Sequence, residues 1–145
     1  MCLKNISEMK KTDDDIIVYK FIKVCGKKLF TPYYGVKIKI GKTYHSEIVI
    51  NNGYVNLPFK YCGNILIETQ TQDYINVGLH SFKNYEDALN VSNNYVVNWN
   101  KKGIIVKCII PKNSIYYDGI FDDGMYINNL PSIVSNTIKY VEILN

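Results

Sequence analysis

Histidine is the side chain best suited to acid–base chemistry near neutral pH, and this chain has two, His45 and His80. His80 follows Gly78 at the end of a predicted strand, just before the clearest helix start in the sequence. In mixed folds such a strand-to-helix corner commonly positions a ligand or a catalytic group. We therefore take His80 as the candidate catalytic residue. The alternative is a structural histidine that is hydrogen-bonded to a neighbouring backbone carbonyl.

The residues that usually complete a catalytic or metal site are missing from the sequence. Ser46 and Ser81 directly follow the two histidines, which gives poor geometry for activating a nucleophile, and no Gly-x-Ser-x-Gly motif occurs. The glycine-rich phosphate motifs of P-loop and Rossmann proteins are missing as well. No Cys-x-x-Cys pair exists, so we predict no metal site and free, mostly buried thiols at Cys2, Cys25, Cys62 and Cys108.

The basic residues are biased in type, because all 17 of them are lysine. Without arginine the chain lacks the bidentate fork that usually binds carboxylates and phosphates. Lysine, asparagine, isoleucine and tyrosine are abundant, and there is one alanine, Ala88. These preferences indicate an AT-rich genome, viral or bacterial. They also favour strands over helices, because β-branched and aromatic residues dominate.

Tyrosines and lysines could form a binding face in the first half of the chain. The candidates for this interaction face are Tyr33, Tyr34, Lys37 and Lys39. Tyrosine is common at protein interfaces, and bases of single-stranded nucleic acid stack on aromatic rings beside basic groups. The alternative is codon bias combined with half-buried strands, since the net charge of +4 is modest.

Short strands and one helix must position these residues. Strands are predicted over 16–24, 36–40, 65–69, 74–79, 104–110, 114–117, 125–129 and 137–144, with a hairpin turning at Asn51-Asn52-Gly53. The main helix is predicted near 84–97 with Asn84 as its N-cap. Residues 1–14 are predicted to form a short helix or a loose arm, and Asp118, Asp122 and Asp123 a solvated loop. Overall we expect a sheet-dominated α+β fold, one domain over 1–145, with seven to nine short, mostly antiparallel strands.

Several short motifs resemble a known group of proteins. They are Val18-Tyr19-Lys20, Tyr33-Tyr34-Gly35, Ile40-Gly41-Lys42-Thr43-Tyr44, Gly78-Leu79-His80-Ser81-Phe82 with Glu86-Asp87-Ala88, and Val106-Lys107-Cys108-Ile109-Ile110-Pro111. Over about residues 16–120 their order resembles an uncharacterised small domain family of phage, bacterial and large-virus proteins. The outline is also similar to that of ADP-ribosyltransferases. That resemblance implies NAD contacts at Tyr19, Lys20 and His80, with Tyr85 beside the nicotinamide. The sequence departs from it, because Lys20 replaces the expected arginine or histidine and no catalytic glutamate is placed.

The first functional hypothesis is therefore a small non-catalytic binding protein, encoded by a virus or mobile element and needing no cofactor. It would bind a host protein, such as a CRISPR effector or another defence factor, or a small nucleotide ligand. The alternative is an NAD-dependent mono-ADP-ribosyltransferase-like enzyme, and the third hypothesis is a lysine- and tyrosine-based nucleic-acid binder. With no secretory signal and no apolar run near the roughly 20 residues that span a membrane, we expect a cytoplasmic protein without a membrane partner.

Overall fold

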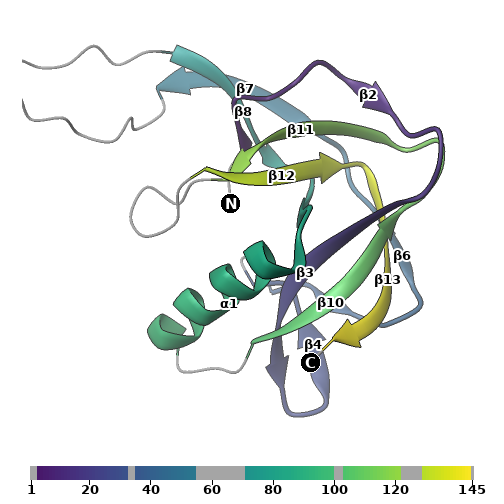
Figure 1. Cartoon of the computed structure of the whole chain (residues 1–145), viewed down its shortest axis with the longest axis vertical. Helices are drawn as coiled ribbons and strands as arrows, with labels where there is room; N and C mark the ends of the chain where they lie inside the picture. The colour runs from purple at the N-terminus through teal and green to yellow at the C-terminus, as the bar shows by residue number, and fades with distance from the viewer. Residues whose placement is uncertain (1–2, 33–34, 55–70, 100–102, 122–128, 145) are drawn as a thin grey trace, which may run out of the picture.

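The computed structural model describes residues 3–32, 35–54, 71–99, 103–121 and 129–144. They form one curled antiparallel sheet with a single helix beside it (Figure 1). The helix is α1 (Tyr85–Trp99). The strands are β1 (Leu3–Lys4), β2 (Lys10–Lys11), β3 (Ile16–Cys25), β4 (Lys28–Phe30), β5 (Lys37–Ile38), β6 (Thr43–His45), β7 (Val49–Tyr54), β8 (Thr71–Val77), β9 (Leu79–Phe82), β10 (Gly103–Ile110), β11 (Ile115–Phe121), β12 (Leu130–Ser135) and β13 (Thr137–Leu144).

The sheet-dominated class is confirmed, but the predicted seven to nine strands are too few, since the described residues form 13. The main path runs β6-β13-β10-β3-β9-β12-β11-β1-β8-β7. Strands of two or three residues account for most of the difference, because they are too short to show a periodic pattern. The predicted arm over 1–14 is one such case: it contributes β1 and β2, and Leu3 is fully buried.

The centre of the sheet is the pair β3 and β10, which align from Gly103 opposite Lys23 to Ile110 opposite Ile16. Both strands have a neighbour on each side in the main path of the sheet. Alternate side chains of β3 point to opposite faces. Val18 and Ile22 enter the apolar cluster inside the curl, and Phe21 enters the cluster on the opposite face.

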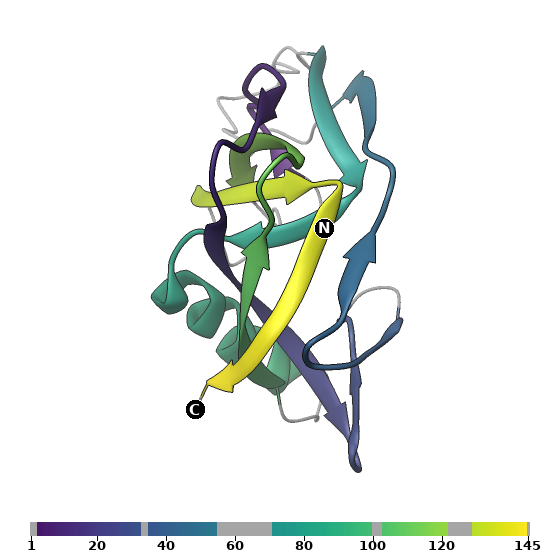
Figure 2. The ribbon, with the colours of Figure 1, turned by 90° about the vertical axis from the view of Figure 1, so that its right-hand side faces the viewer.

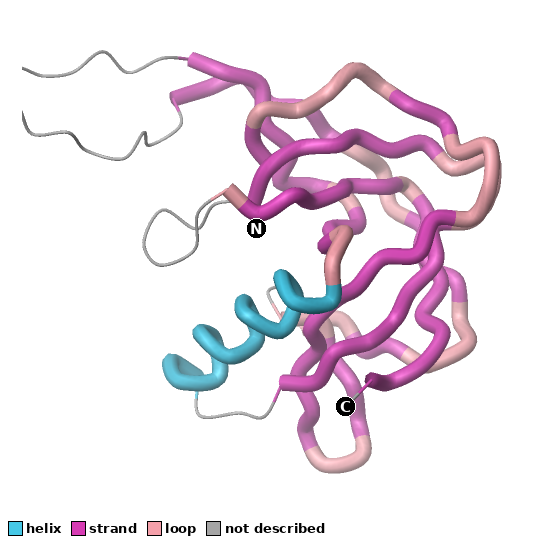
Figure 3. The backbone as a smooth tube through the Cα atoms, viewed as in Figure 1, coloured by secondary structure: helices cyan, strands magenta, loops and turns pink. Residues whose placement is uncertain are grey.

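Helix α1 covers the outer face of this central pair (Figure 3). Ala88 and Val91 are fully buried against Phe21 and Ile105. The predicted cap is confirmed at Asn84, whose carbonyl accepts a hydrogen bond from the Ala88 N–H at 3.3 Å. Its side-chain amide donates to the Asp87 carboxylate at 3.1 Å.

Two sharp bends curl the sheet. Figure 2 shows β12 turning sharply into β13. Asn136 lies between these two strands, and its backbone N–H donates to the Ile115 carbonyl at 3.0 Å. Its side-chain oxygen accepts from the Ile115 N–H, also at 3.0 Å. The other bend lies between β8 and β9, at Gly78, where φ is +146°. Gly78 therefore separates two strands, and His80 lies inside β9 rather than at the end of a strand as predicted.

Three local predictions are wrong because tertiary pairing overrides the local signal. Asn51-Asn52-Gly53 forms no turn but continues β7 opposite β8. The strand expected over 36–40 shrinks to Lys37–Ile38. Asp118 lies within β11, where its carboxylate binds Lys10 at 2.8 Å and Lys83 at 2.6 Å instead of facing solvent in a loop. The strand predicted over 65–69, residues 125–128 of the strand predicted over 125–129, and Asp122 and Asp123 lie outside the described residues.

Candidate functional site

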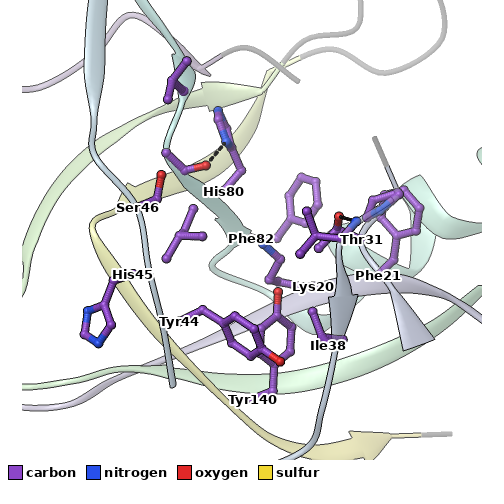
Figure 4. A pocket seen from close by; sticks show the side chains of 15 residues that line it. Lys20, Phe21, Thr31, Ile38, Tyr44, His45, Ser46, His80, Phe82 and Tyr140 are labelled. Atoms are coloured by element: carbon purple, nitrogen blue, oxygen red, sulfur yellow. Dashed lines mark hydrogen bonds between the residues drawn. The ribbon is translucent and has the colours of Figure 1, made fainter. Parts of the chain in front are cut away.

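A pocket of about 400 Å³ opens on the inner side of the curl. Its volume lies within the range of small-molecule sites. The walls come from β3, β9, β13 and the segment that runs from β4 to β6 (Figure 4). Most lining side chains are apolar or aromatic: Phe21, Pro32, Val36, Ile38, Tyr44, Val77, Leu79, Phe82 and Tyr140, with the polar Lys20, Thr31, His45, Ser46 and His80 and the backbone of Gly78.

Lys20 is the charged group of this pocket. It occupies an inward position of β3 between Val18 and Ile22, so strand alternation carries its side chain into the apolar interior. Only 9% of the residue is exposed. Among the described residues no carboxylate pairs with its ammonium group and no acceptor hydrogen-bonds to it. Burial lowers the pKa of Lys20 to about 8, because the low-dielectric surroundings disfavour the charged form.

The titratable neighbours of Lys20 are neutral near pH 7. The Tyr140 ring lies 5.9 Å from the Lys20 nitrogen and gives it a weak cation–π contact. Burial raises the pKa of the Cys108 thiol to about 12 and raises that of the Tyr140 hydroxyl as well. Tyr44 meets Tyr140 edge-to-face at 5.4 Å, and its hydroxyl accepts a hydrogen bond from the Lys39 N–H at 2.8 Å. The ammonium therefore has no described counter-charge.

His80 contacts the backbone on both sides of the bend between β8 and β9. Its Nδ1 lies 3.1 Å from the Gly78 carbonyl oxygen, the contact that Figure 4 marks, and its Nε2 lies 3.2 Å from the Ile75 carbonyl oxygen. Burial, together with the charge of Lys20, lowers the pKa of His80 to about 4, although the two carbonyl contacts oppose the change. At neutral pH the ring is therefore uncharged, and its single N–H donates to one of the two carbonyls.

Acidification should destabilise the fold through His80. The folded-state pKa lies below the usual 6.5, so the folded chain binds fewer protons than the unfolded chain between pH 6.5 and about 4. Stability should fall by roughly 3 kcal/mol as the pH drops through this window. Urea unfolding at several pH values checks this, with His80→Gln compared against His45→Gln, because His45 is exposed. His80→Gln should flatten the pH dependence. Equal slopes in the two variants would contradict the assignment.

The four ligand-binding candidates from the sequence divide into two pairs. Lys20 and His80 both line the pocket. Tyr19 and Tyr85 instead pack edge-to-face, with ring centroids 6.1 Å apart, in the cluster under α1. The cause is strand alternation: Tyr19 precedes Lys20 in β3, so it must face the opposite side of the sheet.

Only the two lysines of the predicted interaction face belong to the residues that the structure describes. Lys37 and Lys39 are exposed, whereas Tyr33 and Tyr34 lie outside the described residues. Between the two lysines Ile38 is buried, while Val36 and Ile40 are exposed. Cys25 is also exposed, and Cys108 is buried as expected.

Sequence reasoning missed the aromatic side of the pocket, Tyr44 and Tyr140. These residues come from β6 and β13, which pair antiparallel although they are far apart in sequence.

One local signal was present for the site: Lys20 interrupts an inward row of apolar residues, Val18 and Ile22. A lysine at such a position predicts a buried ammonium group.

No group of three or more His, Cys, Asp or Glu side chains within the described ranges is arranged to hold a metal ion. Within the same ranges, none of the helical structure has the length and apolar character needed to cross a membrane.

Comparisons with protein-family models, with curated proteins and with solved structures found no significant match to the chain. The resemblances to the phage and viral domain family and to ADP-ribosyltransferases therefore stay predictions. The case for function rests on the pocket, in which one buried ammonium group lies among apolar and aromatic walls.

Proposed function

We propose that the protein is a non-catalytic binding protein for a small molecule that has an apolar body and one anionic group. The observation that carries this proposal is Lys20, a residue that is only 9% exposed and lines a mostly apolar pocket, with no described counter-charge for its ammonium group. An uncompensated buried charge is costly, and a ligand anion would offset that cost. The apolar walls would take up the rest of the ligand.

Binding fits the pocket better than hydroxyl- or histidine-based catalysis, because its histidine and serine side chains already contact other groups of the chain. Both His80 nitrogens contact backbone carbonyls. The Ser46 hydroxyl donates to the Glu47 carbonyl at 2.8 Å, and His45 Nδ1 contacts the Thr137 hydroxyl at 3.2 Å. No described hydroxyl or thiol of the lining is paired with a free base.

The proposal narrows the earlier hypothesis of a small nucleotide ligand. Lys20 is the one lysine among the described lining residues, and a single ammonium group suits one anionic group better than a polyphosphate. The NAD-dependent alternative expects Tyr19 and Tyr85 at the same site, and these pack on the other face of the sheet. Host-protein and nucleic-acid binding stay predictions from composition alone.

A matched pair of fluorescent ligands tests the proposal. 8-Anilinonaphthalene-1-sulfonate and N-phenyl-1-naphthylamine share an apolar aromatic body, but only the first carries a sulfonate. The wild-type protein should bind the sulfonate about tenfold more tightly or better, as expected for a buried charge pair. Lys20→Met should abolish that preference while neutral-ligand binding persists.

Lys139→Met is the matched control, because it removes the same charge from an exposed neighbour of Tyr140 on β13. It should leave the preference for the sulfonate unchanged. Equal affinity of the wild type for the two ligands would refute the proposal, as would equal losses in the Lys20 and Lys139 variants. Circular dichroism of each variant confirms that binding is compared between folded proteins.

A further inference from the structure

We propose that Lys20 captures small apolar aldehydes as a reversible imine inside the pocket. This inference rests on the proposed function, since it requires that the pocket admits a small apolar ligand. It goes further by naming a second ligand class, carbonyl compounds, and by assigning a covalent step to the Lys20 nitrogen. The same side chain would thus serve anionic ligands as a cation and carbonyl ligands as a nucleophile.

The first support is the placement of the amine. The Lys20 nitrogen belongs to a side chain that is nine-tenths buried, lines the pocket and has no hydrogen-bond acceptor among the described residues. An amine attacks a carbonyl only in its neutral form, and desolvation in an apolar pocket favours that form. With its pKa lowered to about 8, Lys20 offers on the order of a hundredfold more neutral amine at pH 7 than an ordinary lysine.

The second support is the set of groups around it. The titratable or charged side chains that approach Lys20 come from each packed strand: Cys108 from β10, His80 from β9, Tyr140 from β13 and Tyr44 from β6. None is a carboxylate that would hold the ammonium form. Burial keeps the Cys108 thiol protonated, so it is a poor competitor for the carbonyl carbon.

The step is a balanced condensation that needs no oxidant or reductant. The nitrogen lone pair forms a bond to the carbonyl carbon, and the carbonyl oxygen takes up a proton to give a carbinolamine. That hydroxyl group then leaves as water with the remaining proton of the nitrogen, and a C=N bond forms. The apolar walls receive the alkyl chain and exclude water, which disfavours hydrolysis of the imine.

Reductive trapping tests the proposal on the full chain. The protein is incubated with octanal and sodium cyanoborohydride near pH 7, followed by intact-mass measurement and peptide mapping. One addition is expected first, with the mass of the aldehyde less one oxygen atom, located at Lys20. Its rate should exceed that of the average exposed lysine at least about tenfold. Acetaldehyde, which lacks the apolar chain, should show much weaker selectivity for Lys20.

Two controls separate this inference from the proposed function. Lys20→Arg keeps the charge but should lose the selective adduct, and anilinonaphthalene sulfonate should protect Lys20 but not Lys139 from octanal. If the sulfonate binds in a Lys20-dependent way but octanal modifies lysines evenly, the imine proposal is wrong and the proposed function stands. If Lys20-dependent sulfonate binding also fails, both are wrong.

Discussion

Replacing Lys20 with methionine is expected to raise the free energy of unfolding at pH 7 by roughly 3 kcal/mol. Methionine has a similar length but carries no charge, so it can fill the inward position beside Val18 and Ile22 without desolvating an ammonium. The magnitude follows from the lowered pKa of Lys20, about 8 in the folded chain against an ordinary value of 10.5. Each unit of that difference corresponds to about 1.4 kcal/mol.

The pH dependence gives this prediction a second readout. Below pH 8 both the folded and the unfolded chain hold the Lys20 proton, so the full penalty applies. Between pH 8 and pH 10.5 the folded chain releases it first, and the penalty disappears. Urea unfolding at pH 7 and pH 10 should therefore show a large advantage of Lys20→Met that shrinks at the higher pH. Lys139→Met should show neither effect, and a Lys20→Met variant less stable than wild type at pH 7 would overturn the reasoning.

A residue that costs stability and improves binding is typical of a functional site. If Lys20 formed a structural ion pair, its removal would leave a partner unpaired, but the described residues include no such partner. Asp118 is the contrast, because its half-buried carboxylate is matched by Lys10 and Lys83. The chain thus pairs a half-buried charge within β11, whereas the more deeply buried Lys20 has no described counter-charge at the pocket.

The long periodic segments of the fold could be predicted from the sequence, because several residues agree on one structure. Strand β3, strand β10, strand β13 and helix α1 all lie near their predicted places. In α1 the capping residue Asn84 and the acidic first turn, Glu86 and Asp87, act together. When several local signals agree, the presence and type of an element can be predicted even though its exact ends differ by one or two residues.

The failures arise where a distant partner decides the conformation. Asn52-Gly53 favours a hairpin turn, but pairing with Asp73 and Gln72 of β8 extends it into a strand. The pocket shows the same dependence. Lys20 and His80 could be selected from sequence, yet their neighbours Tyr44 and Tyr140 reach the site through the pairing of β6 with β13. No local pattern carries that information.

Gly78→Ala is expected to destabilise the protein by about 3 kcal/mol or more. At φ +146° an L-residue is strained at this position, whatever space surrounds it. A Cβ at this position would also overlap the Cγ1 atom of Val134, a fully buried residue in β12. The backbone there cannot shift freely, because His80 contacts the Gly78 carbonyl.

Gly26→Ala is the matched control for backbone strain without a steric clash. Gly26 also has a positive φ, +62°, but a Cβ there meets no atom within 4 Å. Gly26→Ala should lower the free energy of unfolding by about 1–2 kcal/mol, the usual penalty for an L-residue in the left-handed region. The difference between the two variants in urea unfolding measures the clash with Val134. Because Gly78 lines the pocket, its variant should also weaken binding of the naphthylamine ligand, whereas Gly26→Ala should not. Equal losses in the free energy of unfolding would show that the backbone at Gly78 shifts easily to accommodate the methyl group. The bend would then not be the rigid element that holds His80 beside the pocket.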